Sequence, residues 1–570
     1  MENFQDKANF IWQVADDILR GTFKQHEYGD VILPFVVLRR LDCVLEDSKD
    51  RVMETFEKFK NKLQDPSQIL LKATGGKNFY NTSHYDLKRL SQDAKEIELN
   101  FNNYLNNYSE NVRDIIENFQ IDKLIKRLVN NDLLFLLINK FTEIDLHPDK
   151  VSNHEMGYIF EELLRRFSEM SNETAGEHYT PREVIRLMVN LLFAEHKGEL
   201  KGKGLIRTIY DPACGTGGML TVAKENIINN INPDLDIIMC GQQLNEQTYA
   251  IAKSDFLMLG ENEENIKQGN SFTKDKFKGK KFNYMLCNPP FGVSWKKEQN
   301  FIKNEANDPY GRFAAGLPRS SDGALLFLQH MISKMELKGS RIAIIFNSSP
   351  LFTGDAGSGE SNIRKLIIEN DWLEAIIAIP TELFYNTGIS TYIWVLTNSK
   401  PQKRKGKIQL INAIQFYKYL RKNLGNKRKY ISDEQIKEIT EIYTKFEENE
   451  YCKIFENEDS GYTKVTIERP LIKNSILVTD ANGNSKPDSQ KRGFERVPLK
   501  EDIEVYFKRE VKPHLPDSWV DRNKDKVGYE ITFNKYFYKY KPLRLLKEIT
   551  QDLLKLEEET EGLLKEILKQ

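Results

Sequence analysis

Residues 206 to 397 alternate between short apolar runs and amphipathic runs, and this alternation constrains the fold more than any other feature. Short apolar runs predict buried strands, and longer runs with apolar residues three and four apart predict helices. The predicted strands are 206–210, 236–240, 282–287, 341–346, 374–379 and 391–397, and the predicted helices are 182–193, 217–229, 245–258, 322–335 and 361–369. This order predicts a mostly parallel, doubly wound sheet, in which ligands bind at the carboxyl ends of the strands.

A glycine-rich turn follows the first predicted strand and reads Asp211-Pro212-Ala213-Cys214-Gly215-Thr216-Gly217-Gly218. Its glycines allow the backbone to approach a nucleoside-bearing cofactor closely at a helix N-terminus. The turn lacks the Gly-Lys-Ser/Thr ending of a phosphate-binding loop, which argues against a nucleoside triphosphate. The acidic residue that opens the turn suits a cationic ligand, such as the ammonium end of S-adenosylmethionine.

A second turn, Asn288-Pro289-Pro290-Phe291, follows the predicted strand 282–287. Consecutive prolines fix φ at about −65° and remove two backbone donors, so the carbonyl groups there are free to accept hydrogen bonds from a ligand. An exocyclic amino group on a planar ring fits this turn. Its N–H groups would meet the Asn288 oxygen and the Pro289 carbonyl, while the ring stacks on Phe291. Taken alone, the same four residues are equally typical of an ordinary strand-ending turn.

With Gly176-Glu177-His178-Tyr179-Thr180-Pro181-Arg182, the two turns resemble the motifs of a known family. That family is the modification (M) subunits of type I restriction–modification systems, which are adenine-N6 DNA methyltransferases. The motif order is that of the γ class of amino-methyltransferases, and the resemblance extends from Ile11-Trp12 to the C-terminal helix. It implies S-adenosyl-L-methionine as the cofactor and double-stranded DNA as the substrate. The target adenine would be flipped into the pocket at Asn288.

The resemblance also implies roles for individual residues. The segment before the glycine turn would help to close over the cofactor, although packing is an alternative role for His178. Asn270 would contact the cofactor's adenine, although it is also a plausible plain turn residue. The implied catalytic residues are Asn288, Pro289, Pro290 and Phe291, and the implied cofactor-binding residues are Glu177, His178, Tyr179, Thr180, Pro181, Arg182, Asp211, Pro212, Gly215, Thr216, Gly217, Gly218, Gln243 and Asn270. No metal is needed, because a sulfonium is already an excellent leaving group.

One position departs from the family pattern. The second strand usually ends in Gly-Gln-Glu, whose carboxylate binds the ribose hydroxyls of the cofactor, but this chain has Gly241-Gln242-Gln243. Glutamine can still hydrogen-bond a hydroxyl but loses charge assistance, which is worth about a factor of two in bond strength. The sequence therefore predicts weaker cofactor binding with activity retained. The alternatives are that Glu246 substitutes or that the chain methylates poorly.

Several other features allow two interpretations. Cys287 precedes Asn288, but its strand context favours a buried structural thiol. The glycine-rich run 351–360 suits a mobile loop that faces DNA or the extruded base, and a plain surface loop equally well. The basic clusters 400–407 and 421–429 are candidates for phosphate contacts, although solvated loops explain them nearly as well.

The N-terminal part, residues 1–165, is predicted to be a helical domain. Apolar residues recur at helical spacing in 11–20, 31–41, 97–119 and 124–141, and Pro34 is expected near the start of its helix. By resemblance this domain packs beside the target duplex, but a scaffold or cap is equally compatible with the sequence. Residues 166–475 are expected to form the Rossmann-like catalytic domain.

The C-terminal part, residues 476–570, is predicted to be an assembly region with a helical, coiled-coil tail. The polar stretch 481–492 is typical of a linker. The last helix carries an apolar stripe over about three heptads, formed by Leu546, Ile549, Leu553, Leu556, Leu563 and Ile567. By resemblance this stripe docks on the specificity (S) subunit, in a complex of two M subunits with one S subunit, and a restriction (R) subunit is also expected. Packing within the chain is the alternative.

Composition narrows the class of protein. A chain of 570 residues has room for about three or four domains. Its net charge of −1 exerts no overall attraction for DNA, so binding requires a local basic face or a partner. The five cysteines are widely spaced, which predicts a reduced, cytoplasmic protein. No apolar run approaches the roughly 20 residues needed to span a bilayer, and the first residues are no secretory signal.

Two other functions remain open. Asn-Pro-Pro-aromatic motifs also serve methylases of RNA and of glutamine side chains in proteins. A non-catalytic assembly subunit that has lost cofactor binding is the third possibility, and Gln243 is its only support.

Overall fold

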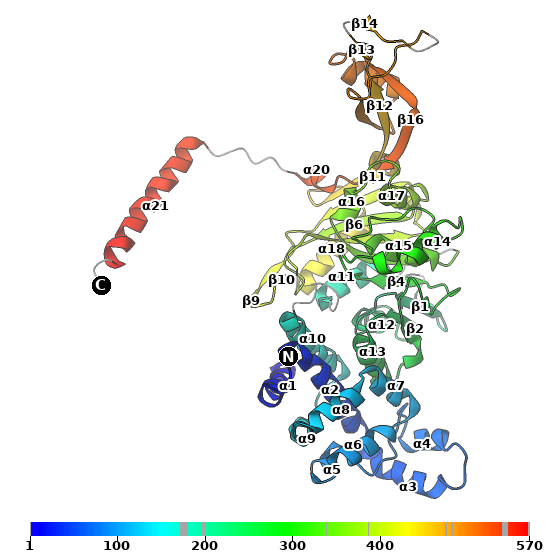
Figure 1. The fold of residues 1–570 in the computed structure, drawn as a ribbon, viewed down its shortest axis with the longest axis vertical. Coiled ribbons are helices and arrows are strands. Elements are labelled where there is room, and N and C mark those ends of the chain that lie inside the picture. The colour runs from blue at the N-terminus through cyan, green and yellow to red at the C-terminus, as the bar shows by residue number, and fades with distance from the viewer. Residues whose placement is uncertain are drawn as a thin grey trace. The chain divides into compact units, whose positions relative to one another are not determined.

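The structure is a computed structural model that describes residues 2–171, 180–195, 198, 200–337, 339–385, 387–473, 476–479, 483–538 and 545–567. The chain forms two units, Met1–Ile531 and Thr532–Gln570 (Figure 1). Within the first unit, an N-terminal set of helices is followed by a large sheet with its covering helices. No described helix is long and apolar enough to cross a membrane.

The N-terminal part is helical, as predicted. Its helices are α1 (Glu2–Leu19), α2 (Tyr28–Leu45), α3 (Lys49–Phe59), α4 (Ser67–Ala73), α5 (Leu87–Leu90), α6 (Ile97–Asn106), α7 (Glu110–Asn118), α8 (Ile121–Val129), α9 (Leu134–Thr142) and α10 (Asn153–Ser171). Helix α2 is the core of this part, because 16 of its 18 residues are buried. Buried Arg40 on α2 donates to the Val151 carbonyl (2.8 Å) and to Asn153 Oδ1 (2.6 Å), which fastens the start of α10.

Three details of this part were predicted wrongly. The run 97–119 forms two helices, α6 and α7, because the Ser109 N–H donates to the Tyr80 carbonyl (3.0 Å) and the chain turns there. The run 124–141 also forms two helices, α8 and α9, separated at Asp132, whose left-handed backbone (φ 58°) cannot continue a helix. Pro34 lies inside α2 and not near its start, since the helix begins at Tyr28.

The centre of the chain is a nine-stranded sheet with the order β11-β8-β6-β7-β5-β4-β1-β2-β3. Its strands are β1 (Ile206–Asp211), β2 (Asp236–Gln243), β3 (Ile266–Gln268), β4 (Tyr284–Cys287), β5 (Arg341–Asn347), β6 (Leu373–Ile379), β7 (Thr391–Thr397), β8 (Lys407–Asn412) and β11 (Cys452–Glu456). Only β7 and β11 pair antiparallel to their neighbours, so the predicted mostly parallel sheet is confirmed. All six predicted strands are present, whereas β3, β8 and β11 were not predicted.

The helices that connect the strands agree closely with the predicted ones. They are α11 (Arg182–Phe193), α12 (Gly218–Asn230), α13 (Glu246–Met258), α15 (Ala324–Ser333) and α17 (Gly359–Glu369), joined by the unpredicted α14 (Gln299–Ala306), α16 (Ser349–Phe352) and α18 (Asp433–Lys445). Register brings the ends of the first strands together, since Asp211 of β1 pairs with Gly241 of β2, and Tyr210 pairs with Met285 of β4.

Helix α13 also contacts the N-terminal helices. Lys253 on α13 is buried and bonds Asp114 of α7 (2.6 Å), and the Glu246 carboxylate accepts a hydrogen bond from Gln120 (2.7 Å). The same helix follows directly on the end of β2. It therefore connects the carboxyl edge of the sheet to the helical part.

Beyond the large sheet, the chain forms strands that were not predicted. β12 (Gly461–Glu468), β15 (Gly493–Pro498) and β16 (Trp519–Tyr529) make a three-stranded antiparallel sheet, and β13 (Ile472–Lys473) pairs with β14 (Ile476–Leu477). The predicted linker 481–492 lies between β14 and β15, partly outside the described residues. Helix α19 (Ile503–Tyr506) continues as a π-helical turn, Phe507–Val511.

The glycine-rich run 351–360 is fastened by its neighbours. Asp355 accepts hydrogen bonds from Tyr462 (3.2 Å) and Lys464 of β12, and Arg364 donates to the Gly354 carbonyl (3.2 Å). The alternative of a mobile loop is therefore not supported by these contacts.

The second unit contains α20 (Phe533–Phe537) and α21 (Leu546–Ile567), so the predicted terminal helix is confirmed. Four residues of its apolar stripe are exposed, namely Leu546, Ile549, Leu553 and Leu556. Leu563 and Ile567 lie in the part of α21 whose side chains are not described.

Candidate functional site

The glycine turn after β1 is packed tightly against β2. Gly217 has φ 85° and precedes the first residue of α12, a conformation that favours glycine. The Cys214 N–H donates to the Gln242 carbonyl (3.1 Å), and a Cβ on Gly241 would lie 2.8 Å from the Cys214 sulfur. The turn therefore has room for β2 only because residue 241 has no side chain.

Asp211 lies directly behind this turn. Its carboxylate is buried and accepts a hydrogen bond from the Ala213 N–H (2.9 Å). Burial raises the pKa of the Asp211 carboxyl to about 7, although the hydrogen bonds from Ala213 and Cys287 lower it. Asp211 thus holds the shape of the turn, and its neighbours Pro212 and Ala213 form the surface in front of it.

A cavity of about 330 Å³ lies at the carboxyl ends of β1 to β4. Its walls are formed by Pro212, Ala213, Gln243, Leu244, Asn245, Asn270, Ser271, Phe272, Asn288, Pro290, Val293, Ser294, Trp295, Glu298, Gly323 and Phe327. We call it the strand-end cavity. It brings together residues from three separate motifs that the sequence analysis singled out, including Pro212, Gln243 and Asn288. The glycine turn and the Asn-Pro-Pro-Phe turn therefore share one cavity.

Asn288 has one half of its amide engaged and the other half without a partner. Its Nδ2 donates to the hydroxyl of buried Thr180 (2.8 Å). Its Oδ1 is buried and has no hydrogen-bond partner in the part of the chain that the structure describes. Leaving a buried acceptor without a hydrogen bond lowers the stability of the fold by about 1–3 kcal/mol. A ligand that donates a hydrogen bond at this point would satisfy it.

Thr180 is positioned by Pro181, which is the N-cap residue of α11. The Pro181 carbonyl accepts hydrogen bonds from the N–H groups of Val184 (2.9 Å) and Ile185 (3.1 Å) in the first turn of that helix. The proline thus fixes where the preceding hydroxyl lies. The other residues predicted in this segment, Glu177, His178 and Tyr179, lie outside the described residues.

Pro289 and Phe291 are not on the wall of the strand-end cavity. Pro289 is buried, and Phe291 is partly exposed and packs against the core of the sheet. Cys287, one residue before the turn, is buried, and burial raises the pKa of its thiol well above the ordinary value. A thiol of this kind is a poor nucleophile, in agreement with a structural role.

Gln243 and Gln242 connect the end of β2 to the neighbouring turns. Gln243 lines the cavity, and its Oε1 accepts a hydrogen bond from the Gly215 N–H (3.2 Å). Gln242 donates to the carbonyls of Gly269 (3.1 Å) and Lys274 (2.9 Å). Glu246, the alternative carboxylate, bonds Gln120 and is not among the residues of the cavity wall.

Asn270 has the contacts of a turn asparagine. Its Oδ1 accepts hydrogen bonds from the N–H groups of Phe272 (2.9 Å) and Thr273 (3.2 Å), and its Nδ2 donates to Glu298 (3.1 Å). These bonds hold Asn270 on the cavity wall. They leave little of its side chain free for a cofactor.

Sequence reasoning missed Glu298 and the aromatic wall of the cavity. Among the described residues of the wall, Glu298 is the only carboxylate, and Trp295, Phe272 and Phe327 supply aromatic surface. Trp295 is held by a hydrogen bond from its Nε1 to the Arg319 carbonyl (3.0 Å). Trp295 and Glu298 follow the Asn-Pro-Pro-Phe turn in a short segment without periodicity, whereas Phe272 precedes that turn and Phe327 lies on α15. For Trp295 and Glu298, the only available signal was their closeness in sequence to the turn.

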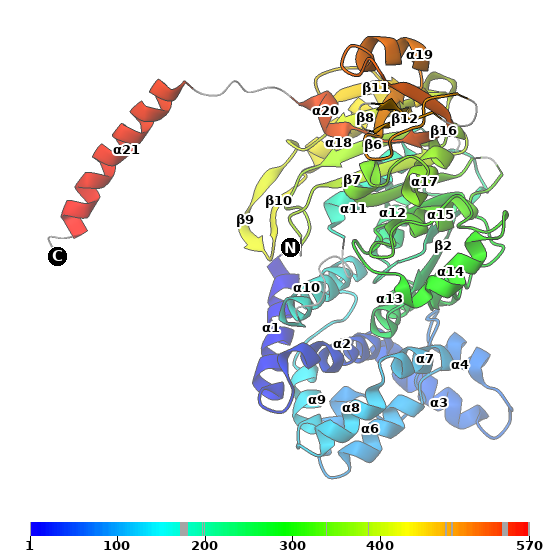
Figure 2. The same ribbon diagram turned by 45° about the horizontal axis from the view of Figure 1, so that its top comes forward.

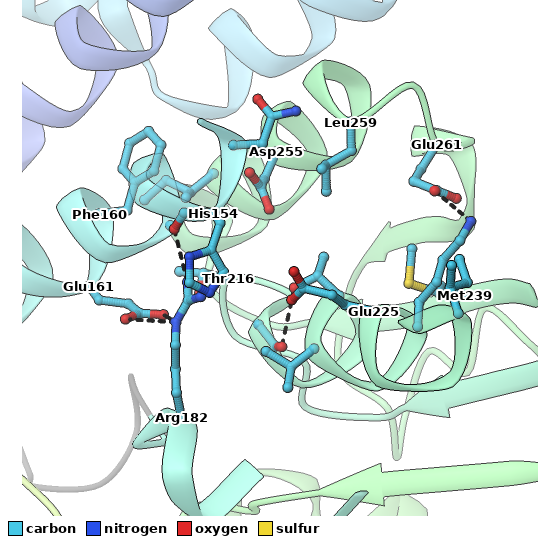
Figure 3. A pocket seen from close by; sticks show the side chains of 18 of the residues that line it. His154, Phe160, Glu161, Arg182, Thr216, Glu225, Met239, Asp255, Leu259 and Glu261 are labelled. Carbon is cyan, nitrogen blue, oxygen red and sulfur yellow. Dashed lines mark hydrogen bonds and ion pairs between the residues drawn. The ribbon is translucent and has the colours of Figure 1, made fainter. Parts of the chain in front are cut away.

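Three predicted cofactor residues line a different cavity, of about 310 Å³, between α10, α12 and α13 (Figure 3). These are Arg182, Thr216 and Gly218. The Arg182 guanidinium binds Glu161 (3.0 and 3.3 Å) and lies 3.9 Å from the centre of the Tyr158 ring. Arg182 therefore ties α11 to α10 and does not reach the strand-end cavity.

Asp255 on α13 points into this second cavity (Figure 3). Burial raises the pKa of its carboxyl to about 7, against the lowering effect of Arg182 and Arg40. Among the described residues, no group of three or more His, Cys, Asp or Glu side chains is arranged to hold a metal ion.

Comparison with known proteins gives matches over most of the chain. The sequence model described as N-6 DNA methylase matches residues 151–508, and the one described as HsdM N-terminal domain matches residues 7–141. The MjaIX methylase subunit, a type I restriction enzyme component of Methanocaldococcus jannaschii, is 28% identical over 500 residues, covering 83% of this chain and 82% of the relative. The MjaVII methylase subunit of the same organism is 30% identical over 356 residues, covering 61% of this chain and 58% of the relative.

The fold is also similar to that of a solved structure. The type I restriction–modification methyltransferase subunit from Streptococcus thermophilus aligns with a TM-score of 0.61 at 21% identity. The alignment covers 80% of this chain and 97% of that one. At this level of identity the similarity shows a shared fold.

Proposed function

Because the chain belongs to the N-6 DNA methylase family, among the modification subunits of type I restriction–modification systems, we propose that it methylates adenine N6 in double-stranded DNA. S-adenosyl-L-methionine is the methyl donor in this proposal. The observation that carries it is the buried Asn288 Oδ1, an acceptor without a partner among the described residues, on a cavity shared with the glycine turn.

The acceptors at Asn288 and Pro289 suit an amino group. An adenine amino group carries two N–H donors, which would meet Asn288 Oδ1 and the Pro289 carbonyl. Accepting both hydrogens draws electron density toward the nitrogen, so that its lone pair becomes a better nucleophile. Extruding the base from a duplex costs a few kcal/mol. In this proposal, stacking on partly exposed Phe291 and the two hydrogen bonds offset that cost.

The strand-end cavity fits a nucleoside-bearing cofactor. Its volume of about 330 Å³ is within the range of small-molecule sites, and its aromatic wall suits a purine. Gln243 and Glu298 are the polar groups that would bind ribose hydroxyls or ring nitrogens. S-adenosylmethionine, when bound, supplies a methyl group on a sulfonium. The protein's contribution is then to align the amine with that methyl group at near-attack distance.

The assembly implied by the family is part of the proposal. The exposed apolar stripe of α21 is suited to docking on a specificity subunit, in a complex of two modification subunits and one specificity subunit that a restriction subunit joins. Since the net charge of the chain is −1, DNA recognition would depend on such partners and on local basic surface.

The experiment is methyl transfer by Asn288→Ala. Tritium transfer from labelled S-adenosylmethionine to hemimethylated DNA is measured with a co-expressed specificity subunit, and cofactor binding is measured in parallel. We expect a loss of about 100-fold or more, the scale seen when a preorganised polar group at the reacting centre is removed, with cofactor binding largely intact. Turnover at the wild-type rate would refute the role of Asn288.

Asn457→Ala is the matched control, because Asn457 is also half-buried with an unpartnered Oδ1 but lies outside the cavity wall. It should lose stability without losing methyl transfer. RNA and glutamine-containing protein serve as alternative acceptors in the same assay. Transfer to either of these and not to DNA would replace the proposed substrate, and failure to bind cofactor would indicate an assembly subunit.

A further inference from the structure

The hairpin formed by β9 (Lys418–Leu424) and β10 (Lys427–Tyr430) is strongly basic. Residues 416–430 contain six lysines and arginines and no acidic residue. The chain as a whole carries a net charge of −1, so this concentration is local. Most of β9 is exposed, so most of its side chains do not pack in a core.

The hairpin begins at the edge of the sheet that holds the strand-end cavity. It follows β8, which runs parallel to β6, and the carboxyl ends of all the parallel strands lie at that edge. Both views show the hairpin extending away from the rest of the sheet (Figures 1 and 2). It is therefore an arm on the side of the sheet where the target base would be bound.

The turn end of the hairpin, at residues 425–427, is anchored to the elements of the site. Lys427 is buried, where it forms an ion pair with Glu183 of α11 and donates to the Leu383 carbonyl (2.9 Å). The Asn426 N–H donates to the Tyr385 carbonyl (2.7 Å). Because α11 begins two residues after Thr180, the arm is fixed to the same helix that places the partner of Asn288.

The charges along the arm differ in their partners. Lys418 lies 3.4 Å from Glu434, and Arg428 and Lys429 lie 3.6 and 3.3 Å from Glu382. In contrast, Arg421 and Lys422 are exposed and form no ion pair with any described residue. Tyr419 beside them is 67% exposed. Free cations next to an exposed aromatic ring are typical of a nucleic-acid surface.

We propose that the β9–β10 hairpin binds the sugar–phosphate backbone of duplex DNA beside the target base, with Arg421 and Lys422 each neutralising a phosphate. This inference rests on the proposed function for its choice of partner. The contact is independent of sequence, because phosphates are the same at every position. It would hold the duplex at the cavity while a partner chain reads the bases.

The test is the salt dependence of duplex binding by the full chain. The probe is a short DNA duplex of arbitrary sequence, and the variant is Arg421→Gln with Lys422→Gln. Each phosphate contact contributes about 0.9 to the slope of log affinity against log salt, so the slope should fall by about 1.8. An unchanged slope would overturn the inference.

The matched control is Lys201→Gln with Lys203→Gln. These lysines are also exposed and form no ion pair with a described residue, but they precede β1 and so belong to the opposite edge of the sheet. Their replacement should leave the slope as it is, and an equal fall in both variants would also overturn the inference. Trp295 fluorescence on adding S-adenosylmethionine should be the same in all three proteins, which shows that the cavity is intact.

Failure of the inference can be distinguished from failure of the proposed function. Methyl transfer by the wild-type complex, together with an unchanged slope in the hairpin variant, would refute the arm and leave the function standing. If the hairpin variant lowers the salt slope but the wild-type complex transfers no methyl group, the phosphate contact is supported and the proposed function is refuted. A fall in the salt slope that is seen only with duplex RNA as the probe would overturn the assignment to DNA.

Discussion

Thr180→Val removes the hydroxyl that orients the Asn288 amide. In the structure Nδ2 donates to the Thr180 hydroxyl (2.8 Å), which leaves Oδ1 free to accept. Valine has nearly the same volume but no acceptor, so a buried N–H loses its partner at a cost of about 1–3 kcal/mol. The amide can then turn over, and in that orientation it would present N–H groups to the amino group of the base.

If that cost falls on the transition state, kcat should decrease by about 5-fold to 150-fold, since about 1.4 kcal/mol corresponds to a factor of ten. The KM for S-adenosylmethionine should change little, because Thr180 is not on the wall of the strand-end cavity. The assay is steady-state methyl transfer by the assembled complex. Thr180→Ser keeps the hydroxyl and should restore most of the activity. A valine variant with the wild-type kcat would show that the hydroxyl does not position Asn288.

Three further predictions concern the cavity walls. Gln243→Glu should bind S-adenosylmethionine about fivefold more tightly, because a charged acceptor adds about 1 kcal/mol to a hydrogen bond, and equal or weaker affinity would count against a ribose contact. Glu298→Gln should weaken binding by a similar factor with kcat retained, as measured by Trp295 fluorescence, and unchanged affinity would remove Glu298 from the site. Asp255→Asn should raise the melting temperature at pH 8 and leave it nearly unchanged at pH 4. Burial raises the pKa of Asp255 from 3.8 to about 7, so the folded state binds more protons than the unfolded state between these values and loses stability as pH rises. A melting-temperature difference that does not grow with pH would contradict this assignment.

The parts of the fold that were predicted well are those with local signals. Helix α13 begins where the Asn245 side chain accepts a hydrogen bond from the Thr248 N–H, and α12 begins after Gly217 in a left-handed conformation. Both are start signals that the sequence carries within a few residues. The buried strands β5, β6 and β7 also carry a local signal, because each is a nearly continuous apolar run.

The parts that were missed depend on distant partners. β12 is a mixed polar and apolar segment whose neighbour β16 begins about 50 residues later, so its pairing leaves no local pattern. The break between α6 and α7 is caused by the hydrogen bond from Ser109 to Tyr80, which periodicity does not reveal.

The same distinction holds for the site. The strand-end positions of Gln243 and Asn288 follow from the strand pattern, and they lie on one cavity as expected. The position of Arg182 was not predictable, because its contact with Glu161 depends on how α10 packs beside α11. Glu298 and Trp295 reach the cavity through the packing of an irregular segment, for which the sequence has no periodic signal.

Helix α13 is held on two sides: its first turn follows the wall residue Asn245, while Glu246 and Lys253 bond to the N-terminal helices. A ligand that displaces those helices must therefore work against the geometry of the wall. Binding of the cofactor at the wall and binding of a ligand at the N-terminal helices then belong to one thermodynamic cycle. In that cycle each ligand changes the affinity of the other by the same factor. Cofactor titrations on the free and the assembled subunit would measure that coupling directly.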